Sequence, residues 1–295
     1  MTAVHIISNP VAGGGRGATM AVALATALEA RGLTVTRFAT ARAGDARAEA
    51  ALERAEVIAV VGGDGTLNEV LNGLPERSTA RLALLPVGTA NVVARELGMR
   101  PDAAFVADAI VRGCAIAMDI GLHGDRRFLL GAGAGVDAAI TKAVQEQRGR
   151  KSSLIHWVGP ALKTLARYRY PKIAVYVDGE ELASAADYVI VGNCRFSAGI
   201  FPATPHADTG DGKLDICALS GLSLPRLGWL MARVWHPTFV ERPWIAYRQG
   251  HEVELRARDA GETIYLQVDG DPAGALPARF AMADWPVHMI VPQAP

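Results

Sequence analysis

Three segments of this 295-residue chain place glycines and polar side chains directly after short apolar runs that are typical of strands. They span residues 9–17, 62–69 and 86–91. Glycine lets backbone N–H groups approach phosphate oxygens without a Cβ in the way, and a following helix adds the positive end of its dipole. In an α/β sheet, ligands bind outside the carboxyl ends of the strands. The loops therefore predict a phosphate-binding cradle, although each loop alone could be only a tight turn.

Asp64 is an acidic side chain inside the second loop, where it lies between two glycines. A carboxylate at the mouth of a sheet can hold Mg²⁺ directly or through water, as phosphoryl transfer requires. Thr66, Asn68 and Glu69 follow it at the start of the next expected helix. These three side chains could bind the same ligand or could simply cap the helix.

Two other nucleotide-binding motifs can be tested against the residues. A Walker A loop requires Gly-Lys-Ser/Thr, but the pair Gly212 and Lys213 is followed by leucine. A dinucleotide fingerprint is partly met by Gly13, Gly15 and Ala18. The strand that follows ends in Phe-Ala-Thr and lacks the acidic residue that would bind a ribose. Neither motif is therefore complete.

The elements that must position these loops alternate through the first ~120 residues. The expected strands span residues 4–7, 33–38, 57–61 and 82–85, and the expected helices span residues 18–31, 45–54, 67–71 and 91–97. Alternation with short connections predicts a parallel sheet with helices on both faces. We therefore predict an N-terminal α/β domain over residues 1–120, to which the tail 280–295 could return.

The pattern changes beyond residue 120, where strand-like segments are separated by turns such as Asp178-Gly179 and Asp269-Gly270. The expected strands span residues 128–130, 173–177, 188–191, 214–218, 252–256 and 264–268, with helical insertions around 154–169 and 222–232. Such a pattern is typical of an antiparallel β domain. We therefore predict a second, β-rich domain over residues 121–279.

Composition narrows the class of protein. Thirty basic and thirty acidic residues give a net charge of zero, which argues against a general nucleic-acid binder. Three scattered cysteines indicate neither a disulfide framework nor a zinc site. No apolar run reaches the ~18 residues of a transmembrane helix, and the first residues read as a strand rather than a signal peptide. We expect a cytoplasmic protein that could touch the inner face of a membrane.

The three loops together resemble the diacylglycerol kinase catalytic family, which includes bacterial soluble lipid kinases, sphingosine kinases and ceramide kinases. The similarity rests on the run Gly62–Glu69, with Asn9, Pro10 and Gly13 upstream and Gly88–Asn91 downstream. It extends over essentially the whole chain. It implies a parallel-sheet α/β domain like that of NAD kinases and diacylglycerol kinases, followed by a mainly antiparallel β-sandwich domain that binds the lipid.

The resemblance also implies a nucleotide site and a metal site. The positions that match the family's ATP contacts are Asn9, Pro10, Gly13, Thr40, Gly62, Gly63, Asp64, Gly65, Thr66, Asn68, Glu69, Gly88, Thr89 and Asn91. A structural Mg²⁺ would be held by the Asp211 side chain and by the backbone carbonyls of Asp208 and Lys213. Hard oxygen ligands suit that ion, although the segment could also be a solvated acidic turn.

The family's general base is the glutamate of an Asp-Gly-Glu motif, and the matching residue here is Asp271. Aspartate is one methylene shorter, which moves the carboxylate by ~1.5 Å. Asp271 could still serve as the base, and Asp269 and Asp64 are alternatives. The run Asp178-Gly179-Glu180 matches the motif better by letters, but it lies between two expected strands and reads as a hairpin turn.

Two basic segments with tryptophans, residues 147–169 and 222–247, could meet a membrane or could be ordinary core helices. We therefore expect an ATP- and Mg²⁺-dependent kinase that phosphorylates a lipid hydroxyl, diacylglycerol by default, at a membrane surface or in micelles. A homodimer is compatible with this expectation. The alternatives are an NAD kinase, which would share Gly62–Gly65, and a protein that binds nucleotide or lipid without turnover.

Overall fold

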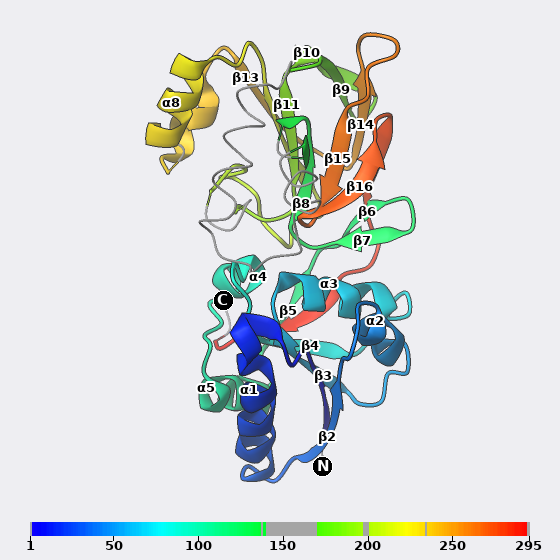
Figure 1. Ribbon diagram of the computed structural model, residues 1–295, viewed down its shortest axis with the longest axis vertical. Coiled ribbons are helices and arrows are strands. Elements are labelled where there is room, and N and C mark those ends of the chain that lie inside the picture. The colour runs from blue at the N-terminus through cyan, green and yellow to red at the C-terminus, as the bar shows by residue number, and fades with distance from the viewer. Residues whose placement is uncertain (1, 137, 140–169, 197–200, 234, 294–295) are drawn as a thin grey trace. The chain divides into compact units, whose positions relative to one another are not determined.

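The structure is a computed structural model that describes residues 2–136, 138–139, 170–196, 201–233 and 235–293 (Figure 1). The chain forms two compact units. The first comprises Met1–Ile120, Arg126–Leu129 and Ala283–Pro295, and the second comprises Gly121–Asp125 and Leu130–Met282. Each unit is therefore assembled from separate stretches of the chain.

The first unit contains a six-stranded sheet in the order β2-β1-β3-β4-β18-β5. The strands are β1 (Ala3–Ser8), β2 (Thr34–Ala39), β3 (Val57–Gly62), β4 (Arg81–Pro86), β5 (Ala115–Met118) and β18 (Val287–Ile290). All neighbours are parallel except β18 and β5. Every residue of the central strand β3 is buried, as expected for a strand covered on both faces. The predicted parallel α/β domain is confirmed, and β18 brings the C-terminal tail into its sheet.

Helices flank this sheet, with α1 beside α5 and α2 beside α3 (Figure 1). Their bounds are α1 (Ala12–Glu29), α2 (Asp45–Ala50), α3 (Asp64–Gly73), α4 (Val92–Glu96) and α5 (Ala103–Arg112). The range of α1 begins before the predicted residue 18 because its first turn contains three glycines with positive φ at residues 13–15, which are not helical. Helix α5 was not predicted, although the Asp102 side chain caps its start and Gly113 ends it.

The second unit consists of antiparallel sheets. One sheet has the order β10-β9-β14-β17-β6 and the other the order β13-β12-β11-β8-β15-β16. The strands are β6 (Gly121–His123), β8 (Gly131–Ala134), β9 (Ile173–Val177), β10 (Glu180–Ala186), β11 (Tyr188–Gly192), β12 (Leu214–Leu219), β13 (Ile245–Gly250), β14 (Glu252–Ala257), β15 (Tyr265–Val268), β16 (Asp271–Ala275) and β17 (Ala278–Met282). The prediction of a mainly antiparallel β domain is confirmed.

The two predicted Asp-Gly turns are confirmed as hairpins. Asp178-Gly179 joins β9 to β10 and Asp269-Gly270 joins β15 to β16, with positive φ at all four residues. One expected strand, residues 128–130, was wrong: it falls across the end of β7 (Arg126–Phe128) and the residues before β8. The backbone N–H of Leu130 donates to the side chain of Asp269 at 2.9 Å rather than to a strand. A side-chain acceptor so distant in sequence cannot be read from the local pattern.

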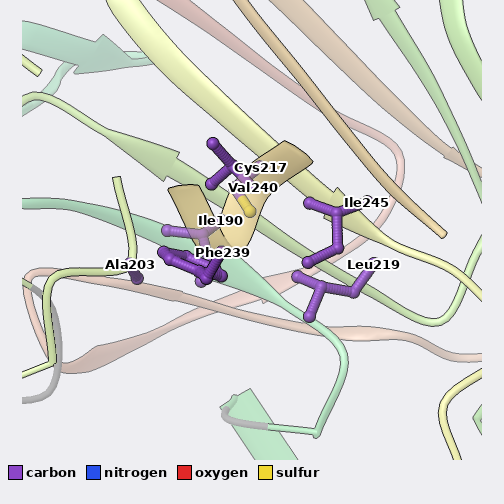
Figure 2. Packing of buried hydrophobic residues seen from close by; sticks show 7 residues of the cluster. All are labelled: Ile190, Ala203, Cys217, Leu219, Phe239, Val240 and Ile245. Carbon is purple, nitrogen blue, oxygen red and sulfur yellow. The ribbon is translucent and has the colours of Figure 1, made fainter. Parts of the chain in front are cut away.

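Helix α8 (Leu224–Arg233) was predicted at 222–232. It and the 3₁₀ helix η1 (Pro237–Glu241) lie between β12 and β13 in the chain. Phe239 and Val240 of η1 pack with Ile190, Cys217 and other buried residues of β11 to β13 (Figure 2). The other expected helix, 154–169, lies outside the described residues, as does most of the basic segment 147–169. No helix in the described part of the chain has the length and apolarity needed to span a bilayer.

Candidate active site

The three glycine-rich loops leave neighbouring strands at the same edge of the first unit's sheet. They follow β1, β3 and β4, which are adjacent in the strand order. The N–H of Asn9 donates to the carbonyl of Val61 at 2.9 Å, and the N–H of Val87 donates to the carbonyl of Gly62 at 2.9 Å. Thr40, which follows β2, likewise donates its N–H to the Ser8 carbonyl at 2.9 Å. The sheet thus gathers the predicted nucleotide-binding segments at the carboxyl ends of four strands.

Glycines allow these loops to pack directly on one another. A Cβ added to Gly88 would lie 2.6 Å from the Cα of Gly63. A Cβ added to Gly13, which has a φ of +59°, would lie 2.1 Å from the carbonyl oxygen of Val87. Both separations are too short for any side chain at these positions. At these glycines the first and second loops each contact the third through backbone atoms, and α3 begins immediately after Gly63. The first N–H groups of a helix lack partners within that helix and suit phosphate oxygens.

Asp64 connects the second loop to the third. Its Oδ2 accepts a hydrogen bond from the N–H of Val92 at 3.0 Å, and its Oδ1 accepts one from the N–H of Val93 at 3.1 Å. These are the first residues of α4. Burial raises the pKa of the Asp64 carboxyl, while the hydrogen bonds from Val92 and Val93 act in the opposite direction. Asp64 therefore caps α4, although Val92 lies 28 residues further along the sequence. The residues next to Asp64 gave no indication of this role.

Asn91 shapes the third loop from within. It adopts a left-handed backbone with a φ of 49°, and its Nδ2 donates to the carbonyl of Gly88 at 2.9 Å. Its Oδ1 is buried and has no hydrogen-bond partner among the residues that the structure describes. A buried polar atom of this kind, next to glycines that leave no room for side chains, fits a surface that accepts a polar ligand. Thr89, between Gly88 and Asn91, belongs to the same loop.

The other polar residues of the second loop have different neighbours. Thr66 is buried and packs on Gly62, where an added Cβ would lie 2.6 Å from the Thr66 side chain. Glu69 Oε2 accepts a hydrogen bond from the N–H of Gly44 at 3.0 Å and so holds the loop that begins at Thr40. Both contacts support the shape of the predicted nucleotide site.

Asn68 instead contacts β7. Its Nδ2 donates to the carbonyl of Arg127 at 3.2 Å. Asn72 donates to the same carbonyl at 2.9 Å and accepts from the Arg127 N–H at 2.9 Å. Sequence reasoning missed Asn72 and Arg127, and the single available signal was that Asn72 lies one helical turn after Asn68. Asn68 therefore holds β7 against α3.

In the second unit, the loop from Asp208 to Lys213 precedes β12. Asp208 Oδ1 accepts from the Gly210 N–H at 3.1 Å, and Asp211 Oδ1 accepts from the Lys213 N–H at 3.0 Å. Gln249 Nε2 lies 3.3 Å from Asp211 Oδ2 and 3.2 Å from Asp215 Oδ2. Gln249 thus bridges an exposed carboxylate and a buried one.

Asp215 is fully buried and also accepts a hydrogen bond from the Tyr247 hydroxyl. Burial raises the pKa of Asp215, and the negative charge of Asp211 adds to that effect. Two close carboxylates with hard oxygen atoms suit a divalent cation. No group of three or more His, Cys, Asp or Glu gathers as a metal site in the described residues, so backbone carbonyls would have to complete the coordination. Tyr247 and Gln249 had no role in the sequence prediction, but an acid within the apolar run of β12 was a visible signal.

The two candidate bases near the C-terminus differ in their surroundings. Asp269 Oδ1 accepts hydrogen bonds from the N–H groups of Leu130 and Gly131 at 2.9 and 3.0 Å, which holds the start of β8. Asp271 is half-buried and begins β16, opposite Val268 of β15. The two hydrogen bonds give Asp269 a structural function at the start of β8.

Comparisons with known proteins cover both units. A family model described as diacylglycerol kinase catalytic domain matches residues 3–123. A second, described as YegS C-terminal NAD kinase beta sandwich-like domain, matches residues 131–294. A diacylglycerol kinase of Staphylococcus carnosus (strain TM300) is 28% identical over 98% of this chain and 95% of its own length. One of Bacillus subtilis (strain 168) is 27% identical over 99% of this chain and 97% of its own length.

A solved structure has the same fold. The crystal structure of a diacylglycerol kinase from Bacillus anthracis str. Sterne superposes with a TM-score of 0.79 at 23% identity, over 98% of this chain and 96% of the other. The two family models together span nearly all of the sequence, in the order in which the α/β and β-sandwich units occur. The chain therefore belongs to the diacylglycerol kinase catalytic-domain family, a family of lipid kinases.

Proposed function

We propose that this protein transfers the γ-phosphate of ATP, with Mg²⁺, to the hydroxyl of a diacylglycerol-type lipid. The observation that carries the proposal is the direct backbone packing of the glycine loops, with Gly63 on Gly88 and Gly13 on Val87, at the carboxyl ends of adjacent strands. The family membership and the names of the relatives support the choice of diacylglycerol.

The nucleotide would bind on backbone groups that are already oriented. N–H groups of the first loop and of the start of α3 would meet the phosphates, with Thr40 and Thr89 beside them. Asp64 and Glu69 contribute by holding α4 and the loop after β2 through hydrogen bonds to Val92, Val93 and Gly44. Donors fixed before the reaction stabilise a developing charge more effectively than donors that must reorganise.

The chemistry requires a proton acceptor and charge neutralisation. The lipid hydroxyl oxygen would form a bond to the γ-phosphorus while the bond from phosphorus to the β,γ-bridging oxygen breaks and ADP leaves. The Asp271 carboxylate would take the hydroxyl proton. Mg²⁺, when bound, spreads the negative charge of the phosphates. At a second position the Asp211 side chain, with the carbonyls of Asp208 and Lys213, would hold a structural Mg²⁺ that stiffens the loop before β12.

The test is phosphate transfer from labelled ATP with Mg²⁺ to diacylglycerol, a ceramide and a sphingoid base in mixed detergent micelles. NAD and a no-acceptor sample run alongside. We expect labelled phosphatidic acid, and we expect the signal to be lost in Asp271→Asn. Labelled NADP would instead establish the NAD kinase alternative. A melting-temperature shift with ATP and Mg²⁺ but no product on any acceptor would favour a binding protein without turnover, and a gain of activity in Asp271→Glu would support that interpretation.

The proposal places the reaction at a membrane. Diacylglycerol does not leave a bilayer readily, because its acyl chains are insoluble in water. We therefore expect a cytoplasmic protein that meets its substrate at the inner membrane face.

A further inference from the structure

The second unit carries a surface of alternating tryptophan and arginine, which we call the Trp-Arg face. It consists of Arg226, Trp229, Arg233, Trp235, Arg242 and Trp244, on α8, around η1 and before β13. The rings of Trp229 and Trp244 meet edge to face with centroids 5.6 Å apart. Arg242 lies over Trp229 at 4.7 Å and Arg226 over Trp244 at 5.2 Å. Arg226, Trp229, Arg242 and Trp244 therefore form a connected aromatic and cationic cluster, and Arg233 and Trp235 lie next to it in the chain, at the end of α8 and before η1.

The inner side of this region is anchored to the sheet. Phe239 and Val240 of η1 are buried against β11 to β13 (Figure 2), and Trp229 and Trp244 pack at the edge of the same cluster. The entry to α8 is fixed because the N–H of Leu222 donates to Asp187 Oδ2 at 2.6 Å. Asp187 is buried and also pairs with Lys172. The Trp-Arg face is thus attached to the sheet through η1 and to Asp187 through the N–H of Leu222.

The outer side is open. Trp235 is 55% exposed, and its ring contacts Phe201 at a centroid separation of 6.1 Å. Arg233 and Arg242 are exposed on either side of η1. A tryptophan ring exposed beside guanidinium groups combines the residue types that are enriched where proteins meet the membrane–water interface.

The charge of the region identifies the kind of partner. Residues 222–247 contain three arginines and one acidic residue, Glu241, whereas the whole chain has a net charge of zero. The basic excess is therefore local. Tryptophan rings sit preferentially at the headgroup level of a bilayer, and arginine is attracted to anionic headgroups. Stacking on Trp229 and Trp244 leaves the guanidinium charge of Arg242 and Arg226 intact.

We propose that the Trp-Arg face docks the protein on an anionic phospholipid bilayer, with Trp235 entering the headgroup region and Arg233 and Arg242 meeting lipid phosphates. The inference rests on the proposed function only in that a lipid kinase needs such a surface. The exposed part of this face is one tryptophan ring with arginines beside it, a combination that suits the headgroup level of a bilayer better than a protein partner.

The experiment is co-sedimentation of the full chain, without ATP, with vesicles of phosphatidylcholine or of phosphatidylcholine mixed with phosphatidylglycerol. We expect binding to the mixed vesicles that weakens with salt. Arg233→Glu should reduce the partition coefficient by about tenfold, since each basic residue near an anionic surface contributes substantially. Trp235→Ala should reduce binding to both vesicle types. The matched control is Arg258→Glu, which makes the same charge change at an exposed position on another part of the second unit.

Unchanged melting temperatures would show that the variants are folded. Equal binding of wild type, Arg233→Glu and Trp235→Ala, or no binding at all, would overturn the proposal, as would equal losses in Arg233→Glu and the Arg258→Glu control. Phosphorylation of diacylglycerol in neutral detergent micelles is measured separately and should be similar in all four proteins. Vesicle binding with the expected variant pattern but no kinase activity would refute the proposed function and leave the docking surface standing.

Discussion

Asp64 Oδ2 lies 3.0 Å from the backbone nitrogen of Val92, and the other carboxylate oxygen accepts from the next residue along α4. The acid at the centre of the Gly-Gly-Asp-Gly loop therefore joins two of the three loops of the candidate nucleotide site. A carboxylate oxygen has lone pairs enough to accept a second contact, so this bond is compatible with a further role toward Mg²⁺. These two hydrogen bonds give Asp64 a structural role in the first unit.

Removing this carboxylate should destabilise the first unit. Asp64→Ala leaves two backbone N–H groups of α4 without their acceptor, and loss of a helix cap costs ~1–2 kcal/mol. Asp64→Asn keeps one amide oxygen and should lose less. Chemical denaturation gives the free energies of unfolding. Equal stability of wild type and Asp64→Ala would contradict the capping role, whatever the effect on activity.

The same residue should give stability a measurable pH dependence. Burial raises the pKa of Asp64 in the folded protein above its ordinary value of 3.8. The folded state then binds the proton more readily than the unfolded state, so the stability contributed by Asp64 is largest in acid and diminishes as pH rises through the raised pKa. Asp64→Asn does not titrate. The difference in unfolding free energy, wild type minus variant, should therefore fall from about pH 4 upward and then level off. A difference that grows with pH would refute the assignment.

Glycine packing between the loops should be essential for ATP binding. Gly88→Ala places a Cβ 2.6 Å from the Cα of Gly63, so the loops must separate. Overpacking of this kind costs ~1–3 kcal/mol. If this cost destabilises the loop conformation that binds ATP, the affinity for ATP should fall by about tenfold or more. Calorimetric titration measures the affinity. Gly228→Ala is the control, because a Cβ at that helical position in the second unit meets no atom within 4 Å.

Asp271 and Asp269 should respond differently to substitution. Asp271→Asn should lower kcat by ~10²–10⁴, the usual contribution of a general base, with little change in melting temperature. Asp269→Ala should lower the melting temperature, because the N–H groups of Leu130 and Gly131 lose their acceptor. The two measurements on each variant assign the roles. Full kcat in Asp271→Asn would place the base elsewhere.

Mg²⁺ should stabilise the second unit through Asp211 even without nucleotide. A ligand that binds the folded state alone raises the melting temperature. We expect a shift with Mg²⁺ in the wild type that is lost in Asp211→Asn. Asp259→Asn removes an exposed carboxylate elsewhere in the second unit and should keep the shift. Identical shifts in all three proteins would mean that the loop before β12 is a solvated acidic turn.

Local patterns predicted most of the elements that form the sheet of the first unit. The apolar run of β3 followed by Gly62-Gly63 indicated both a buried strand and the loop that leaves it. Residues 102–113 show where such reasoning was incomplete. The Asp102 cap and Gly113 were visible signals for α5, but the helix was not predicted. The strand at 128–130 was wrong because the acceptor for Leu130 is Asp269, 139 residues away.

Residue types and their spacing along the chain were enough to predict that glycine loops follow parallel strands, that a β domain follows an α/β domain, and which family the motifs resemble. Those features depend on spacing and residue type along the chain. The tertiary structure decided what each polar side chain touches: Asp64 bonds to α4, Glu69 to Gly44 and Asn68 to Arg127. Strand order and sheet register bring these partners together, and neither is encoded in the local pattern around any one of them.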